Sequence, residues 1–137
     1  MKQLFVTLLL ITVIVACNSK YISPEKLVGK WSPAYQIQKK NAEGNWSEWS
    51  AIDTYPALPD IEFTIDGKFL VDGQPGAGCC SSGNKYTVSG NTIIFSEFAS
   101  CPNFRCMPCY EWEVKELNAQ TLVLESCNNR RKYAKAK

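Results

Sequence analysis

The sequence contains no histidine, and this absence excludes several kinds of active site at once. No imidazole can act as a general base, complete a Ser-His-Asp triad or bind a metal ion. The 15 basic and 13 acidic residues nearly balance, so no strong charge draws the 137-residue chain to nucleic acid. Nucleophile elbows, phosphate-binding loops and zinc-protease motifs are also missing. We therefore expect a protein that is not an enzyme and has no cofactor, metal ion or nucleic-acid partner.

Sustained helical periodicity is missing as well. No stretch of about a dozen residues repeats apolar side chains with the 3.6-residue period of a helix. One short helical candidate covers residues 23–28, where Ser23 can cap the first turn, Pro24 suits its first position and Gly29 can end it. The hydrophobic content of 45% argues against disorder, and the length suits one domain.

The longest apolar run stands at the N-terminus. Lys2 precedes an uncharged stretch over residues 4–16, which is shorter than the ~20 residues of a membrane-spanning helix and is typical of a signal peptide. Ala16 then precedes Cys17, and this arrangement resembles the lipobox of bacterial lipoproteins. The resemblance implies cleavage after Ala16, acylation of Cys17 and a lipid anchor in the cell envelope; Asn18 favours the outer membrane. The alternative is an uncleaved anchor in which Cys17 is an ordinary apolar residue.

Six cysteines remain in the rest of the chain: Cys79, Cys80, Cys101, Cys106, Cys109 and Cys127. An even number of cysteines outside the cytosol predicts three disulfides, although the spacing does not choose among the possible pairings. A bridge between the neighbours Cys79 and Cys80 would close a strained ring, so we expect each to pair with a distant cysteine.

Two other interpretations of these cysteines stay open. Cys101, Cys106, Cys109 and Cys127 have the spacing of a four-thiolate zinc site, although such sites are mainly found in reducing compartments. Cys106 and Cys109 also have the C-x-x-C spacing of a redox-active pair. No helix follows them to lower a thiol pKa, so disulfides remain the favoured interpretation.

Most of the chain after residue 29 shows β patterning. Apolar and polar residues alternate between short turns, and Asp66-Gly67 is a strong hairpin signal. The expected strands cover residues 30–38, 46–52, 61–65, 68–71, 85–88, 92–98, 110–117, 121–126 and 130–134. Residues 56–59, 74–83 and 99–109 are expected to be irregular. This pattern predicts an all-β fold, an antiparallel up-and-down barrel of about eight strands, with a sandwich as the alternative.

The start of this domain resembles the opening of a known family. Gly29 and Trp31, within Leu27-Val28-Gly29-Lys30-Trp31, resemble the G-x-W motif of lipocalins and related calycin barrels. The D-G-K-F, S-G-N-T-I and T-L-V-L segments resemble small lipocalin-like lipoproteins of Bacteroidetes-type bacteria. The resemblance implies that Trp31 closes one end of the barrel and that Arg130 or Arg131 packs across its indole. The cysteine-rich stretches depart from the family pattern.

The domain organisation follows: a signal peptide over residues 1–16, a lipidated tether over 17–25 and a lipocalin-like barrel over 26–137. The resemblance implies that the barrel binds a small hydrophobic ligand. We expect the cavity that holds the ligand to be lined by Phe63, Ile65, Phe69, Tyr86, Phe95, Trp112, Val114 and Leu124. Trp46 and Trp49 would lie on opposite faces of a strand, so that one of them lines the interior.

Two alternatives to ligand binding remain. The cysteine-rich loops would suit a protein-binding or inhibitor-like envelope module, because rigid loops lose less entropy on binding. The other alternative is that the protein is a purely structural lipoprotein of the envelope. Asp60, Glu62, Asp66 and Asp72 lie in or beside one hairpin, where acidic residues are more often solvated turn formers than a catalytic pair.

Overall fold

The computed structural model describes residues 21–105 and 109–137. The predicted signal peptide, Cys17 and Cys106 lie outside these residues. The elements are the helix α2 (Pro24–Leu27) and the strands β1 (Gly29–Lys39), β2 (Ser50–Ala51), β3 (Ile61–Phe63), β4 (Phe69–Val71), β5 (Gln74–Pro75), β6 (Gly83–Ser89), β7 (Thr92–Phe98), β8 (Glu111–Leu117), β9 (Thr121–Ser126) and β10 (Asn129–Lys135). In the described part of the chain, no helix combines the length and apolar character needed to cross a bilayer.

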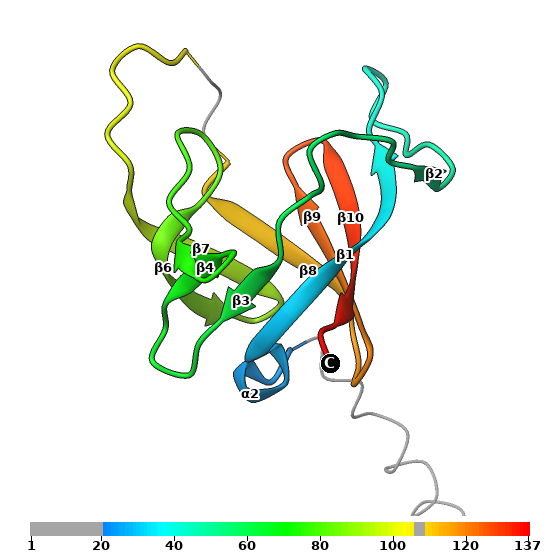
Figure 1. Cartoon of the computed structure of the whole chain (residues 1–137). Coiled ribbons are helices and arrows are strands. Elements are labelled where there is room, and N and C mark those ends of the chain that lie inside the picture. Colours follow the sequence, from blue (N-terminus) through cyan, green and yellow to red (C-terminus); the bar gives the residue numbers. More distant parts are fainter. Residues whose placement is uncertain (1–20, 106–108) are drawn as a thin grey trace, which may run out of the picture.

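The strands form one antiparallel sheet that curls into a nearly closed barrel (Figure 1). Their order is β5-β4-β3-β1-β10-β9-β8-β7-β6, so β1 joins the first part of the sheet to the last strand. The two ends of the sheet meet where the backbones of Lys68 and Lys85 form an isolated antiparallel β-bridge. Beside this bridge the Tyr86 N–H donates to the Gly67 carbonyl over 2.9 Å. This pairing confirms the predicted all-β antiparallel barrel.

Four local expectations are wrong. Residues 74–83 are not irregular throughout, because they contain β5 and the first residue of β6. Ile65 is not in a strand, because the pairing of Phe63 with Phe69 leaves residues 64–68 as the hairpin turn. The strand expected over residues 46–52 is reduced to β2, because Ser47 turns back to donate its N–H to the Lys39 carbonyl over 2.9 Å. Helix α2 forms as expected, but Ser23 makes no side-chain cap hydrogen bond and Gly29, at φ +123°, begins β1.

One end of the barrel, which we call the closed end, is filled by packed side chains. Helix α2 covers it, and the Ile22 N–H donates to the Gly90 carbonyl in the β6–β7 turn over 3.1 Å. The fully buried side chains of the core are Leu27, Trp31, Phe63, Phe69, Ile93 and Leu122. Neighbouring rings meet edge to face, for example Phe63 and Tyr86 with centroids 5.0 Å apart, an arrangement that aromatic quadrupoles favour.

Trp31 closes this end, but the basic residue packed across its indole is not one of those expected. The Lys135 Nζ lies 4.3 Å from the ring centroid and donates to the Val28 carbonyl over 2.7 Å. The expectation of Arg130 or Arg131 is wrong because the β1–β10 register places Lys135 opposite Trp31, whereas both arginines pair near the far end of β1. The Trp31 indole N–H donates to the Leu27 carbonyl over 2.8 Å.

The other end, which we call the open end, carries the cysteine-rich loops. Disulfides join Cys79 to Cys101 and Cys109 to Cys127, and Cys80 is also disulfide-bonded. Cys79 and its partner are 22 positions apart, as expected from the strain of a bridge between neighbours. The zinc and redox interpretations are wrong, because Cys101 and Cys109 each bond another partner. Residues 21–105 and 109–137 contain no cluster of potential metal ligands.

Candidate functional site

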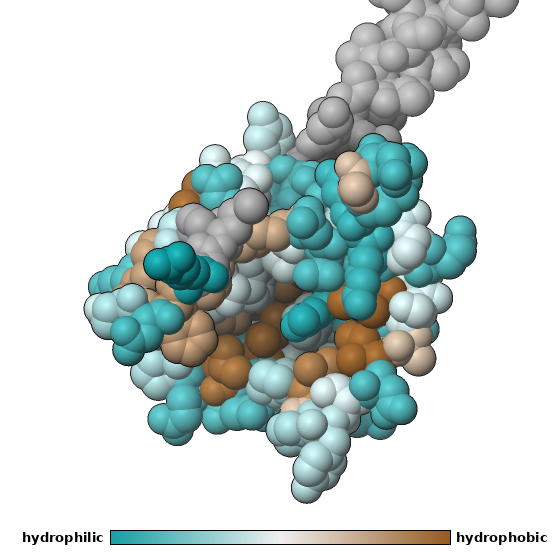
Figure 2. Space-filling model, turned by 90° about the horizontal axis from the view of Figure 1, so that it is seen from above, coloured by the Kyte–Doolittle hydropathy of each residue, from teal (hydrophilic) through white to brown (hydrophobic). Residues whose placement is uncertain are grey.

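A cavity of about 430 Å³ lies inside the barrel at the open end. Its depth is apolar and is formed by Ile61, Phe69, Val71, Trp112 and Leu124. Towards the mouth the lining becomes polar, with Ser81, Ser126, Asn129 and Arg131. Figure 2, seen from this end, shows a hollow with hydrophobic residues in its depth and mostly hydrophilic residues around it. The arrangement suits a molecule with an apolar body.

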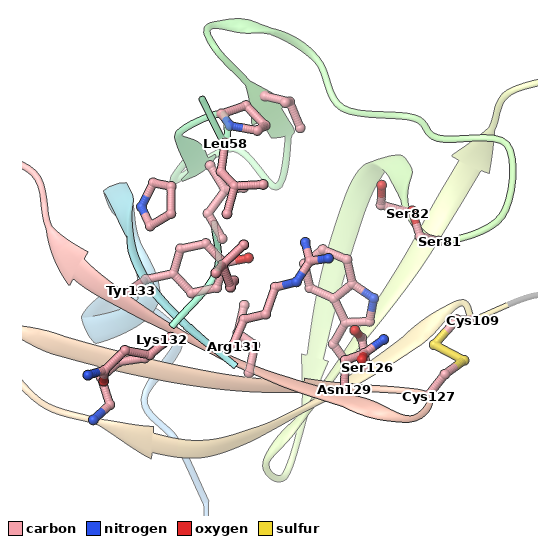
Figure 3. Close-up of a pocket in the computed structure, with 18 of the residues that line it drawn as sticks. Leu58, Ser81, Ser82, Cys109, Ser126, Cys127, Asn129, Arg131, Lys132 and Tyr133 are labelled. Atoms are coloured by element: carbon pink, nitrogen blue, oxygen red, sulfur yellow. A yellow bond between two sulfur atoms is a disulfide. The ribbon is translucent and has the colours of Figure 1, made fainter. Parts of the chain in front are cut away.

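The alternation of β10 determines which of its side chains reach the cavity. Arg131 and Tyr133 pair with Leu124 and Leu122 of β9, and Figure 3 shows both side chains in the pocket. In the same view Lys132 points away from them. Because successive strand residues face opposite sides, Arg130 also lies on the outer face.

A bulge in β1 forms another part of the cavity wall. The register between β1 and β10 shifts between Pro33 and Gln36, and Tyr35 has φ 53°. Such a bulge bends the strand and interrupts regular pairing. Pro33, Tyr35 and Gln36 all line the cavity, so the irregular part of β1 forms one wall of it.

The charges at the cavity are all positive. The Arg131 side chain reaches into it, Lys132 borders it although its Nζ lies outside over Trp49, and no aspartate or glutamate lines it among the described residues. None of the ion pairs within the described chain involves Arg131. Burial raises the pKa of Tyr133, an effect that the nearby Arg131 charge partly opposes, so the phenol is neutral at physiological pH. The cavity therefore combines an apolar interior with a cation and a phenol.

The predicted lining residues fall into three groups. Phe69, Trp112 and Leu124 line the cavity. Phe63, Tyr86, Phe95 and Val114 do not border the cavity and are packed against other buried side chains in the core. Ile65 is a correction: its side chain is 88% exposed in the β3–β4 turn. The Trp112 indole N–H is buried under neighbouring atoms and has no hydrogen-bond partner among the described residues.

Neither Trp46 nor Trp49 lines the interior, contrary to expectation. The Arg130 guanidinium carbon lies 4.0 Å from the centroid of Trp46, and the Lys132 Nζ lies 4.9 Å from that of Trp49. Both indoles therefore pack over the outward-facing cations of β10, where cation–π attraction is worth ~0.5–2 kcal/mol.

The sequence argument missed several lining residues. Ile52, Leu58, Ser81 and Ser82 come from loops, where no periodicity tells an inward side chain from an outward one. Tyr133 could have been identified from the sequence, because it lies two positions after Arg131 in the predicted last strand. The two side chains therefore lie on the same face of that strand.

Comparison with known proteins gives limited information. No protein-family model matches the chain, and no curated protein matches it in sequence. The structure is similar to the crystal structure of a lipocalin-like protein from Bacteroides uniformis, with a TM-score of 0.36 and 19% identity, covering 81% of this chain and 99% of that chain. The assignment of this chain to the antiparallel β-barrels rests on its own strand pairing.

Proposed function

We propose that the protein is a lipid-anchored protein of the bacterial cell envelope whose barrel binds a small hydrophobic molecule. The observation that carries the binding proposal is the cavity of about 430 Å³ with its apolar depth. Small-molecule sites have volumes of roughly 300–1,000 Å³ and are mostly lined by apolar side chains. Each Å² of apolar surface that a ligand buries against Phe69, Trp112 and Leu124 contributes about 25 cal/mol.

The anchoring part of the proposal depends on the sequence around Cys17. An apolar run that ends in Ala16-Cys17 supports export and acylation of the cysteine. The disulfides Cys79–Cys101 and Cys109–Cys127 support an oxidising compartment, since thiols stay reduced in the cytosol. Two acyl chains hold a protein on a membrane durably, because each buried CH₂ is worth ~0.8 kcal/mol.

Ligand binding is tested by blocking the cavity without changing the outer surface. Ile52 lines the cavity, whereas Ile94 is 37% exposed on the outer face of β7. The variant Ile52→Trp should abolish most binding of a fluorescent apolar probe, and the matched variant Ile94→Trp should leave it unchanged. Equal binding by wild type and both variants would contradict the proposed cavity.

The anchor is tested in the intact bacterium. Cells fed an alkyne-labelled palmitate should label the wild-type protein, which should fractionate with the outer membrane. The variant Cys17→Ser should carry no label and should leave the membrane fraction. A labelled Cys17→Ser protein would contradict acylation of this residue.

A second function, protein binding by the cysteine-rich loops, is favoured by exposed aromatic residues beside the open end. Phe98 and Tyr110 stack with centroids 4.2 Å apart on the outside, and Phe104 is 66% exposed in the loop that follows Cys101. A photo-crosslinking residue at position 104 should then give a discrete product in cells, whereas one at position 65, where Ile65 is 88% exposed, should not. The same product from both positions would reject this function.

A further inference from the structure

We infer that the ligand is an amphipathic anion: its acidic head binds the Arg131 guanidinium at the mouth, and its apolar body lies against Phe69, Trp112 and Leu124. This inference rests on the proposed function and names the class of ligand. The head is a carboxylate or a phosphate, which share the oxygen geometry that a guanidinium binds through two parallel hydrogen bonds.

The first argument is the charge of the lining. The apolar depth alone would accept a neutral molecule, but the mouth adds Arg131 and no acidic side chain within the described residues. No carboxylate of the described chain forms an ion pair with Arg131. A cationic ligand would be repelled there. The protein group that interacts with Arg131 among the described residues is the neutral Tyr133 phenol, so the positive charge is not compensated by the protein. An anion supplies the opposite charge.

The second argument comes from the neighbouring arginine. Arg130 Nε lies 2.8 Å from Glu125 Oε2, and its guanidinium stacks on Trp46. The chain therefore provides a carboxylate and an aromatic ring for the outward arginine. Within residues 21–105 and 109–137 it provides neither for Arg131, which follows directly in β10 and faces the cavity.

The third argument is the position of the other polar groups. Figure 3 shows Arg131 reaching into the pocket, with Tyr133 on one side and the Cys109–Cys127 disulfide on the other. The neutral phenol of Tyr133 can donate a hydrogen bond to an anionic oxygen, as can the Asn129 amide at the mouth. Because Arg131 is solvent-exposed in part, a head bound there stays near water while the body enters the barrel.

The test compares ligands with one chain and different heads: dodecanoate, dodecyl phosphate, dodecanol and dodecyltrimethylammonium, each below its aggregation concentration. Calorimetric titration of the wild-type protein should show at least one of the two anions binding about tenfold or more tightly than dodecanol. Which anion binds more tightly distinguishes a carboxylate head from a phosphate head.

The matched variants are Arg131→Gln and Arg130→Gln. Arg131→Gln should reduce the ratio of anion affinity to dodecanol affinity to about one, while Arg131→Lys should restore part of the preference for the anion. Arg130→Gln should keep the preference, and thermal unfolding of each variant checks that the barrel is intact. Binding of the anion should also weaken as salt concentration rises.

Each contrary outcome has a distinct meaning. If dodecanol and the anions bind equally and Arg131→Gln changes nothing, the inference is overturned while the proposed function stands. If Arg130→Gln loses the preference as Arg131→Gln does, the anion binds outside the barrel and the inference is overturned. If the wild-type protein binds none of the four ligands, the proposed function is overturned and the inference with it.

Discussion

The two ends of the barrel are built by different means. At the closed end Trp31 is fully buried, its N–H is satisfied and α2 covers it. At the open end the interior is hollow, and disulfides that include Cys79–Cys101 and Cys109–Cys127 hold loops that have little regular structure. The difference indicates that packing supplies most of the stability at one end, while covalent bonds allow the other end to keep an unfilled interior.

The largest effect should follow from breaking the closed end. Replacement of a fully buried tryptophan creates a cavity, so Trp31→Ala should lower the free energy of unfolding by ~3–5 kcal/mol in urea titrations. Leu58→Ala, at the half-buried mouth, should cost roughly 1 kcal/mol. Comparable losses in the two variants would show that the ends do not differ in packing.

A smaller effect should follow from opening a disulfide at the open end. Cys109 and Cys127 are 18 positions apart, so their bond restricts the unfolded chain. The double variant Cys109→Ser/Cys127→Ser should lose about 2–4 kcal/mol of unfolding free energy. Because both residues also line the cavity, probe affinity should fall as well, whereas Trp31→Ala should affect affinity only as far as it unfolds the protein. Unchanged stability in the double variant would contradict a supporting role for this bond.

The smallest effect concerns two residues on the same face of β10, Tyr133 at the cavity and Lys135 beside Trp31 at the closed end. Burial lowers the pKa of Lys135, so between its folded pKa and 10.5 the unfolded state binds more protons and stability rises with pH. Burial raises the pKa of Tyr133, so above pH 10.0 the unfolded state releases its proton first and stability falls with pH. These two residues should therefore contribute to the pH dependence of stability at alkaline pH with opposite signs.

Urea titrations at increasing alkaline pH separate these contributions. Tyr133→Phe should make the decline above pH 10.0 shallower, and Lys135→Gln should make it steeper. Tyr86, whose pKa is also raised by burial, should maintain part of the decline in both variants. A shallower decline in Lys135→Gln would reverse the sign inferred for that lysine.

Local patterns predicted the barrel because each strand carries its own alternation. Trp112 and Val114 of β8, for example, are both buried, as their spacing requires. In the sequence, Ile65 continues the alternation of Ile61 and Phe63. Its side chain is nevertheless exposed, because the pairing of Phe63 with Phe69 decides where the turn lies. Alternation indicates a face but does not fix the last paired residue.

The site was less predictable because it depends on contacts between distant strands. The partner of Trp31 is Lys135, which only the β1–β10 register, including its bulge, could identify. Alternation places both Phe95 and Leu124 inside the barrel, yet only Leu124 borders the cavity. Which inward residues meet and which leave a space is decided by closure of the sheet.

The attachment of the N-terminal segment at the closed end has a consequence for how the barrel is loaded. Tyr21 lies beside Gly90 at that end, and four residue steps from Cys17 span at most ~14 Å. If Cys17 is acylated as proposed, the anchored molecule stands with its base on the lipid surface and its entrance directed into the aqueous compartment. It would then exchange its ligand with soluble donors and acceptors, and would not take up lipid directly from the membrane leaflet in which it is anchored.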